Sequence, residues 1–215
     1  MLSQKIKGHY KKYVEVVNDI NGDLINLHRI IQTRPESFRN VLNHMLCSRE
    51  LFEGVKNGIL KPRNDIERAA YYYFTIAMSF GGKGDHFAMC KKRKPKNIFR
   101  SYDIYSQRLR GVCIENMDFR RLIKEYDNKD TFFYADHPYV GTESYYKNTE
   151  GFGVKEHQEL YTLLSNIKGK FILSYNDCEF IRGLYKDFKI ESVEVRYTLN
   201  QMHSRKNNEL LIFNF

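Results

Sequence analysis

Short apolar runs alternate with segments of helical spacing along most of the chain. Strands of the buried or half-buried type are predicted by the runs 13–17, 131–135, 170–173, 190–197 and 209–214, and helices by 23–32, 35–56, 64–78, 117–126, 155–167 and 178–185. This alternation favours a mainly parallel sheet with helices on both faces. The last two runs, joined by the polar segment 200–208, predict a terminal hairpin.

The pattern changes between about residues 34 and 110. Helical spacing dominates the first half of this stretch, and 79–97 is rich in Gly, Lys and Arg. We therefore predict that 1–33 and 108–215 form one α/β core, and that 34–107 forms a separate, mostly helical lobe inserted into it.

The charge balance favours a polyanionic partner. Lys and Arg number 35 against 26 Asp and Glu, which gives a net charge of +9, and such an excess attracts phosphates without specifying a base sequence. Cations with interleaved aromatic rings gather in one part of the predicted lobe, at Lys83, Lys91, Lys92, Arg93, Lys94, Lys96 and Arg100. The alternative interpretation is a solvated basic loop. Residues 204–206 form a weaker basic candidate.

Cysteines and apolar stretches predict neither a metal site nor a membrane span. The four cysteines lie far apart with no C-x-x-C pair, so neither a zinc site nor a disulfide framework is indicated. No stretch approaches the roughly 18 consecutive apolar residues that a spanning helix needs. A cytoplasmic location is the expectation.

Polar clusters follow three of the predicted strands, at 18–21, 136–139 and 174–177. In a doubly wound sheet the carboxyl ends of the strands border one crevice where ligands bind. An acid in such a position can accept hydrogen bonds from the two ribose hydroxyls of a nucleoside cofactor, which makes Asp19 a candidate ligand. Spacing alone favours the alternative that Asp19 caps the following helix.

The cluster Asp136-His137-Pro138-Tyr139 has the residue types that methylation of a base amine needs. The lone pair of such an amine is delocalised into the ring, so hydrogen-bond acceptors must draw it toward tetrahedral geometry and accept the developing charge. A carboxylate and a backbone carbonyl can do this, Pro shapes the turn, and a neighbouring aromatic ring can stack on an extruded base. The alternative is an ordinary Asp-x-Pro turn.

These motifs resemble those of the Dam-like, alpha-type DNA adenine methyltransferases. The run FFYADHPYVGTESYY is similar to their catalytic D-P-P-Y motif, NDINGDL to their acidic cofactor turn, and SYND with NELLIFNF to their last strands. The segment 79–84 lies near a family F-x-G segment, and 34–107 has the position of their target-recognition domain. The resemblance implies a Rossmann-like, S-adenosylmethionine-dependent core with an inserted helical recognition lobe.

By this resemblance the chain methylates the exocyclic amino group of a flipped adenine at a specific site in double-stranded DNA, without a metal. Asp136, Pro138 and Tyr139 match the catalytic residues, and Asp19, Ile20 and Asp136 match positions that hold the cofactor. His137 replaces the first proline of the motif, and we expect its side chain to be exposed. A bacterial or phage source and a role such as restriction-modification fit the family, whereas the oligomeric state is left open.

One family feature is missing from the sequence. A glycine-rich loop of the type P-F-x-G-x-G normally follows a first strand, but residues 13–15 lead directly to Asp19. We therefore expect the first strand and this loop to be absent, and Gly81, Gly82 and Gly84 cannot replace them because they follow a predicted helix. The absence favours an alternative function, a catalytically inactive DNA-binding remnant of the family. Methylation of RNA or of a free nucleobase is a third reading.

Overall fold

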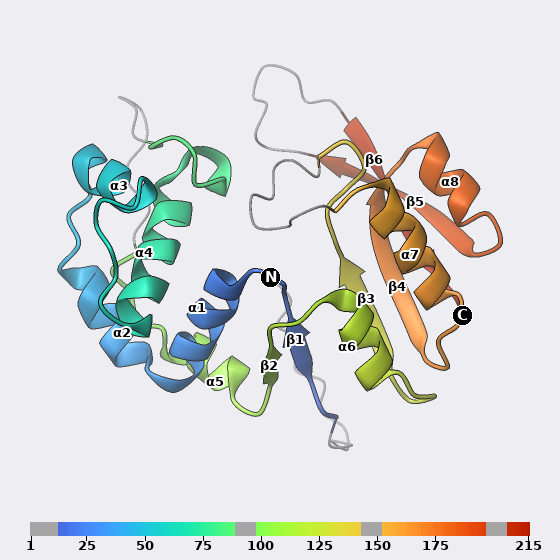
Figure 1. Cartoon of the computed structure of the whole chain (residues 1–215), viewed down its shortest axis with the longest axis horizontal. Coiled ribbons are helices and arrows are strands. Elements are labelled where there is room, and N and C mark those ends of the chain that lie inside the picture. Colours follow the sequence, from blue (N-terminus) through green and yellow to red (C-terminus); the bar gives the residue numbers. More distant parts are fainter. Residues whose placement is uncertain (1–12, 89–97, 143–151, 197–205) are drawn as a thin grey trace.

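The computed structural model describes residues 13–88, 98–142, 152–196 and 206–215. Helices lie to one side of the molecule and a sheet to the other, with a short pair of strands between them (Figure 1). The helical side contains α1 (Gly22–Thr33), α2 (Pro35–Asn43), α3 (Arg49–Lys56), α4 (Asp65–Met78), the short 3-10 turn η1 (Phe80–Gly82) and α5 (Asp103–Leu109).

The strands belong to two separate sheets. Strands β1 (Val16–Asn18) and β2 (Cys113–Glu115) form a parallel pair, and the larger sheet has the order β3-β4-β6-β5, in which only β3 and β4 are parallel. The larger sheet is built from β3 (Phe132–Asp136), β4 (Lys170–Asn176), β5 (Lys189–Arg196) and β6 (Lys206–Phe213), with α6 (Phe119–Tyr126), α7 (Val154–Leu164) and α8 (Glu179–Leu184) around it.

This α/β arrangement confirms the Rossmann-like fold class, and the antiparallel pairing of β5 with β6 over eight residues confirms the predicted terminal hairpin. The expectation of a mainly parallel sheet is wrong for the larger sheet, because the hairpin places β6 antiparallel to both β4 and β5. Within the described ranges, β1 pairs only with β2 and β3 only with β4, and the expected absence of a first strand stays a prediction. Each of these two strands thus has a partner along one edge only in the part of the chain that the structure describes.

One helix prediction is wrong. The segment 35–56 was expected as a single helix, but α2 ends at Asn43 and α3 begins at Arg49. Ser48 starts the second helix, since its hydroxyl accepts a hydrogen bond from the N–H of Leu51 at 3.0 Å. A serine N-cap satisfies an amide that otherwise lacks an intrahelical partner, so it favours a helix start at this point over a continuous helix.

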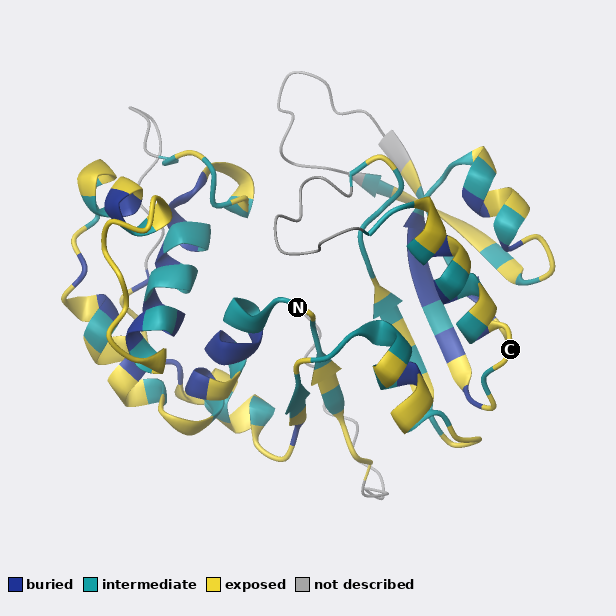
Figure 2. Cartoon of the chain, in the orientation of Figure 1, coloured by how far each residue is buried: buried dark blue, intermediate teal, exposed yellow. Residues whose placement is uncertain are grey.

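Two apolar clusters hold the fold together. In the helical part, α1 packs with α2 and α4 around the fully buried side chains of Phe38, Phe52 and Phe74. The division of the chain at residues 33 and 108 stays a prediction, and α1 contributes to the core of the helical part. In the larger sheet, Phe171, Leu173 and other β4 residues are buried against the helices, which makes β4 the darkest strand in Figure 2.

Among the described helices, none has the length and apolarity needed to cross a bilayer.

Candidate active site

A groove of about 860 Å³ lies where the carboxyl ends of β1 and β3 meet the start of α6 and one face of α7. Asp19, Ile20, Asp136 and Pro138 all line it. The structure thus brings together residues that are more than a hundred positions apart in the sequence, as expected for strand ends in a doubly wound fold.

Asp19 lies in a turn that two other side chains shape. Its Oδ1 accepts a hydrogen bond from the N–H of Asn21 at 2.7 Å, and Asn21 is itself the N-cap of α1, accepting from the amides of Asp23 and Leu24. The alternative in which Asp19 caps the helix is therefore wrong. The Asn116 side chain also donates to the carbonyls of Asp19 and Ile20, at 2.8 and 3.1 Å.

A further asparagine ties the loop after β1 to the loop after β2. The Asn18 amide donates to the carbonyl of Met117 and accepts from its N–H, both at 3.0 Å. A side-chain amide paired in this way with a backbone unit fixes both groups. The backbone around Asp19 is consequently held in place before any ligand binds.

Asp136 is positioned by the neighbouring strand β4. The hydroxyl of Ser174, its register partner, donates to Asp136 Oδ1 at 3.3 Å. The turn that follows Asp136 is fastened by Asn176, whose amide both donates to and accepts from the backbone of Val140. The predicted cluster 174–177 therefore lies beside the D-x-P-Y turn and supports it.

Tyr139 does not line the groove. Its half-buried ring lies beside that of Tyr175, with 6.4 Å between the centroids. Burial is the main cause that raises its pKa to about 12, so the phenol stays protonated at neutral pH. Its predicted role in stacking on an adenine stays a prediction.

The expectation of an exposed His137 is wrong. Its ring packs against Tyr175 at 4.0 Å between centroids, and also contacts Phe152 and His157. Both ring nitrogens are shielded from solvent and lack a hydrogen-bond partner. Burial, together with the nearby His157, lowers the pKa of His137 to about 3, so the imidazole is neutral at ordinary pH. An aromatic side chain in this turn gains more from packing among rings than from pointing into solvent.

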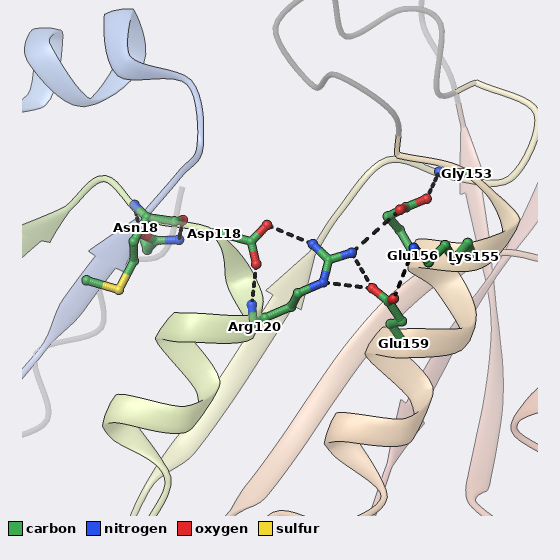
Figure 3. Close-up of polar contacts among 8 residues, drawn as sticks. Asn18, Asp118, Arg120, Gly153, Lys155, Glu156 and Glu159 are labelled. Carbon is green, nitrogen blue, oxygen red and sulfur yellow. Dashed lines mark hydrogen bonds and ion pairs between the residues drawn. The ribbon is translucent and has the colours of Figure 1, made fainter.

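A charged cluster on the groove wall was not foreseen from the sequence. Arg120 pairs with Asp118 at 2.8 Å, with Glu156 at 3.5 Å and with Glu159, and the four side chains converge in Figure 3. The available signal was the polar run 116–118, which follows β2 just as 18–21 follows β1. Strand β2 has only three residues, so its end was hard to detect from the sequence.

Asp19 and Asp136 differ from these acids, because neither forms an ion pair with a described residue. Asp118 and Glu156 both form ion pairs with Arg120. The carboxylates of Asp19 and Asp136 also line the groove, but they have no ion-pair partner among the described residues. The groove is therefore net acidic, and its uncompensated negative charge lies at the ends of β1 and β3.

Two of the predicted DNA-binding residues can be located. Lys83 is exposed just after η1, and Arg100 lies over the Tyr105 ring at 5.1 Å and close to Tyr102. The other five, Lys91, Lys92, Arg93, Lys94 and Lys96, lie outside the described residues.

A Rossmann-like core with a D-x-P-Y turn at the end of a strand, an acidic turn at the end of another and a large helical part defines the class of methyltransferases that act on amino groups of DNA bases. The chain belongs to the D12 class N6 adenine-specific DNA methyltransferase family, whose model matches residues 2–199. Family membership confirms the resemblance drawn from the motifs.

Individual relatives agree with the family. The chain is 20% identical over 204 residues to the type II methyltransferase M.CviBI of Paramecium bursaria Chlorella virus NC1A, a match that covers 91% of this chain and 77% of the viral protein. It is 21% identical over 223 residues to a DNA adenine methylase of Haemophilus influenzae, covering 91% of this chain and 74% of that protein.

Proposed function

We propose that this chain transfers a methyl group from S-adenosylmethionine to the exocyclic amino group of an adenine flipped out of duplex DNA. The observation that carries the proposal is the convergence of Asp19 and Asp136, two carboxylates without a described cationic partner, on one groove. Family membership supports the reaction class, and the groove is the candidate site for it.

The charge and shape of the groove support a nucleoside cofactor with a cationic end. Asp19 follows a strand whose loop is held by Asn18 and Asn116, so its carboxylate is prepositioned to accept hydrogen bonds from two ribose hydroxyls. Ile20 lies beside it on the wall. An acidic groove favours S-adenosylmethionine, which carries a sulfonium and an ammonium, and Asp136 is a candidate partner for that ammonium.

Asp136 also has the chemistry to assist the transfer itself. S-adenosylmethionine supplies an activated methyl group, so the base amine forms the new N–C bond as the S–C bond breaks and S-adenosylhomocysteine leaves. The methylated amine must then lose one proton, which passes to solvent water. A carboxylate that accepts a hydrogen bond from the amine stabilises the positive charge that develops on nitrogen, and no metal is required for this.

The basic residues of the segment 34–107 are proposed to contact the DNA backbone. Lys83 and Arg100 are exposed on the helical side of the molecule, and Lys91, Lys92, Arg93, Lys94 and Lys96 lie between them in the sequence. Such contacts release counterions, so affinity should fall steeply with salt. Replacing Lys91, Lys92, Arg93 and Lys94 by Gln should flatten the salt dependence, whereas Lys186→Gln, an exposed lysine after α8, should not.

The deciding experiment combines a titration with an activity assay. Isothermal titration with S-adenosylmethionine and S-adenosylhomocysteine should give micromolar binding, and duplex DNA should acquire N6-methyladenine. Asp136→Ala should abolish methylation and leave DNA affinity unchanged. Full methylation by that variant would refute the role of Asp136.

A second candidate function is a DNA-binding protein without methyltransferase activity. The observation that favours it is that no described strand pairs with the second edge of β1 or of β3, together with the lack of a P-F-x-G-x-G loop in the sequence. Retained DNA affinity, with no cofactor binding under any condition, would establish this alternative in place of the first.

A further inference from the structure

One face of α4 is fastened to the first turns of α1, the helix that follows Asp19. The two helices lie side by side (Figure 1), and three side-chain contacts join them. These contacts are a hydrogen bond from Asn21 to the hydroxyl of Tyr72 at 3.2 Å, an ion pair of Asp23 with Arg68 at 2.7 Å, and a hydrogen bond from Asn26 to the carbonyl of Asp65 at 2.8 Å. Spacings of three and four positions place the α4 residues on one face of the helix.

Asn21 is the residue through which α4 reaches the turn at Asp19. Its backbone N–H donates to Asp19 Oδ1 at 2.7 Å, its side-chain oxygen caps α1, and its side-chain nitrogen donates to Tyr72. Both ends of the Asn21 amide are thus held, and the direction of its N–H toward Asp19 is fixed with them. Removing the Tyr72 hydroxyl would release one end of this amide.

The electrostatic surroundings of Tyr72 agree with this contact. The phenol is half-buried, and its pKa is raised first by that burial and then by the nearby carboxylates of Asp19 and Asp23, while the hydrogen bond from Asn21 opposes the rise only in part. The hydroxyl therefore keeps its proton at neutral pH. It accepts from Asn21 as a neutral group, without the repulsion that a phenolate would exert on Asp19.

The other end of α4 carries a turn that is proposed to meet DNA. Ser79 closes the helix, since its hydroxyl donates to the carbonyl of Ile76 at 2.9 Å and accepts from the N–H of Gly84 at 2.7 Å. The turn 79–84 is therefore bonded directly to the last turn of α4. Its lysine, Lys83, is exposed, as a contact with a phosphate requires.

The part of α4 between these two ends is short and well packed. About 10 Å of helix axis separate Ser79 from Tyr72, and Phe74 and Met78 in this stretch are buried in the core of the helical part. Close packing keeps such a segment from bending on its own. A ligand that immobilises the turn 79–84 therefore also restrains the Tyr72 hydroxyl.

From these contacts we infer that Tyr72 is a positioning residue for the Asp19 turn, and that DNA bound at the turn 79–84 acts through it on the cofactor side of the groove. Tyr72 is not among the described residues that line the groove, so it acts through Asn21 and does not touch the ligand. A cofactor that meets an already ordered turn loses less conformational entropy when it binds. The DNA contact and the cofactor contact both rest on the proposed function.

The test compares Tyr72→Phe with Tyr71→Phe in the intact protein. Tyr72→Phe keeps the ring between the two helices and removes only the oxygen that accepts from Asn21. Tyr71 supplies the matched control, because it is the preceding half-buried tyrosine of α4 and lines a separate pocket beside α2. Sheared bacterial DNA, which contains every short target sequence, is the DNA probe, and S-adenosylhomocysteine, which cannot be turned over, is the cofactor probe.

Hydrogen exchange of the segment 19–24 is measured by mass spectrometry with and without saturating DNA. In the parent and in Tyr71→Phe, DNA should slow this exchange by about fivefold or more, the usual size of a coupling between two sites, and in Tyr72→Phe by less than about twofold. A purely structural role of Tyr72 would change the exchange rate but not its dependence on DNA.

Equilibrium dialysis gives the matching result for the cofactor. DNA should tighten S-adenosylhomocysteine about fivefold or more in the parent and in Tyr71→Phe, and less than about twofold in Tyr72→Phe. The affinity for DNA, measured without cofactor, should agree within about twofold in all three proteins.

Two outcomes would overturn the inference: exchange of the segment 19–24 that does not respond to DNA in the parent, or a response in Tyr72→Phe as large as in the parent. Loss of the response in Tyr71→Phe as well would also contradict it, because the coupling would then belong to the packing of α4 in general.

The same data separate this inference from the proposed function. A DNA response lost only in Tyr72→Phe, without any binding of S-adenosylhomocysteine, would support the inference and contradict the methyltransferase activity. Methylation of DNA by the parent, with a Tyr72→Phe protein that behaves identically, would have the opposite meaning.

Discussion

The side-chain amide of Asn176 exchanges two hydrogen bonds with the backbone of Val140, each 3.1 Å long, and so fastens the D-x-P-Y turn to the end of β4. Asn176→Asp keeps an acceptor for the N–H of Val140 but places a negative oxygen against its carbonyl. Because positioning dominates a transfer of this kind, we expect methylation to fall by about tenfold or more, with a smaller loss of cofactor affinity. Single-turnover methylation measures the effect.

Asn166→Asp is the matched control for this prediction. Its amide also donates to a backbone carbonyl, that of Thr162 at 2.7 Å, but it lies exposed after α7. If both variants lose methylation equally, the loss reflects general destabilisation, and the turn has no special role.

Asp19 and Asn21 allow cofactor binding to be separated from helix capping. Asn21 caps α1, so Asn21→Ala should lower the free energy of unfolding by about 1 kcal/mol. Asp19→Ala removes the carboxylate that is proposed to bind the ribose, but leaves that cap in place. We expect this substitution to weaken the binding of S-adenosylmethionine by about tenfold or more, because hydrogen bonds to a charged acceptor are lost. The affinity for DNA should not change.

Calorimetry measures the affinity of the two variants for S-adenosylmethionine, and urea denaturation measures their free energies of unfolding. An Asp19→Ala protein that binds the cofactor as tightly as the parent would remove Asp19 from the cofactor site. The turn hydrogen bond from Asn21 to Asp19 would then be the whole role of this carboxylate.

The half-buried His137, whose ring nitrogens are shielded from solvent, should make stability depend on acidity. Its pKa is about 3 in the folded chain and about 6.5 when unfolded, so the unfolded state binds more protons between these values. The stability associated with the neutral ring is therefore complete above pH 6.5 and is lost as the pH falls toward 3, at most about 1.4 kcal/mol for each pH unit.

His137→Phe keeps an aromatic ring among Tyr175, Phe152 and His157 but cannot take up a proton. Urea denaturation at pH 7, 6 and 5 should show a smaller loss of stability in this variant than in the parent. His44→Phe, at an exposed position on the helical side, should follow the parent. If the free energy of unfolding falls equally with pH in all three proteins, the pKa of His137 is not lowered by folding.

The sequence predicted the order of elements because periodicity is a local signal. The strand 131–135 and the helix 64–78 lie within one residue of β3 and α4. The single helix over 35–56 failed because the cap by Ser48 is stronger than the continuing apolar pattern. Asp19 and Asp136 were predicted to meet because strand ends in this fold converge.

Other parts of the site depend on long-range packing that one sequence does not encode locally. The sequence predicts an exposed His137, and the rings contributed by α7 and β4 explain why its ring nitrogens are shielded from solvent instead. The ion pairs of Arg120 join α6 to α7, which lie far apart along the chain. The sequence shows that three polar residues follow strands, Asn18, Asn116 and Asn176. It does not show the backbone groups to which they form hydrogen bonds.

Gly169 has a structural role that can be tested by adding one carbon atom. A Cβ at this position would lie 2.5 Å from the carbonyl oxygen of Thr131 and 2.8 Å from that of Asn128. Backbone atoms at the paired starts of β3 and β4 cannot move aside cheaply, so Gly169→Ala should destabilise the protein by about 1–3 kcal/mol. Gly183 in α8 has nothing within 4 Å of the same Cβ position, and Gly183→Ala should stabilise by about 0.5–1 kcal/mol through reduced chain entropy. Urea denaturation of both variants measures the difference, and a Gly169→Ala protein as stable as Gly183→Ala would show that β3 and β4 do not approach this closely.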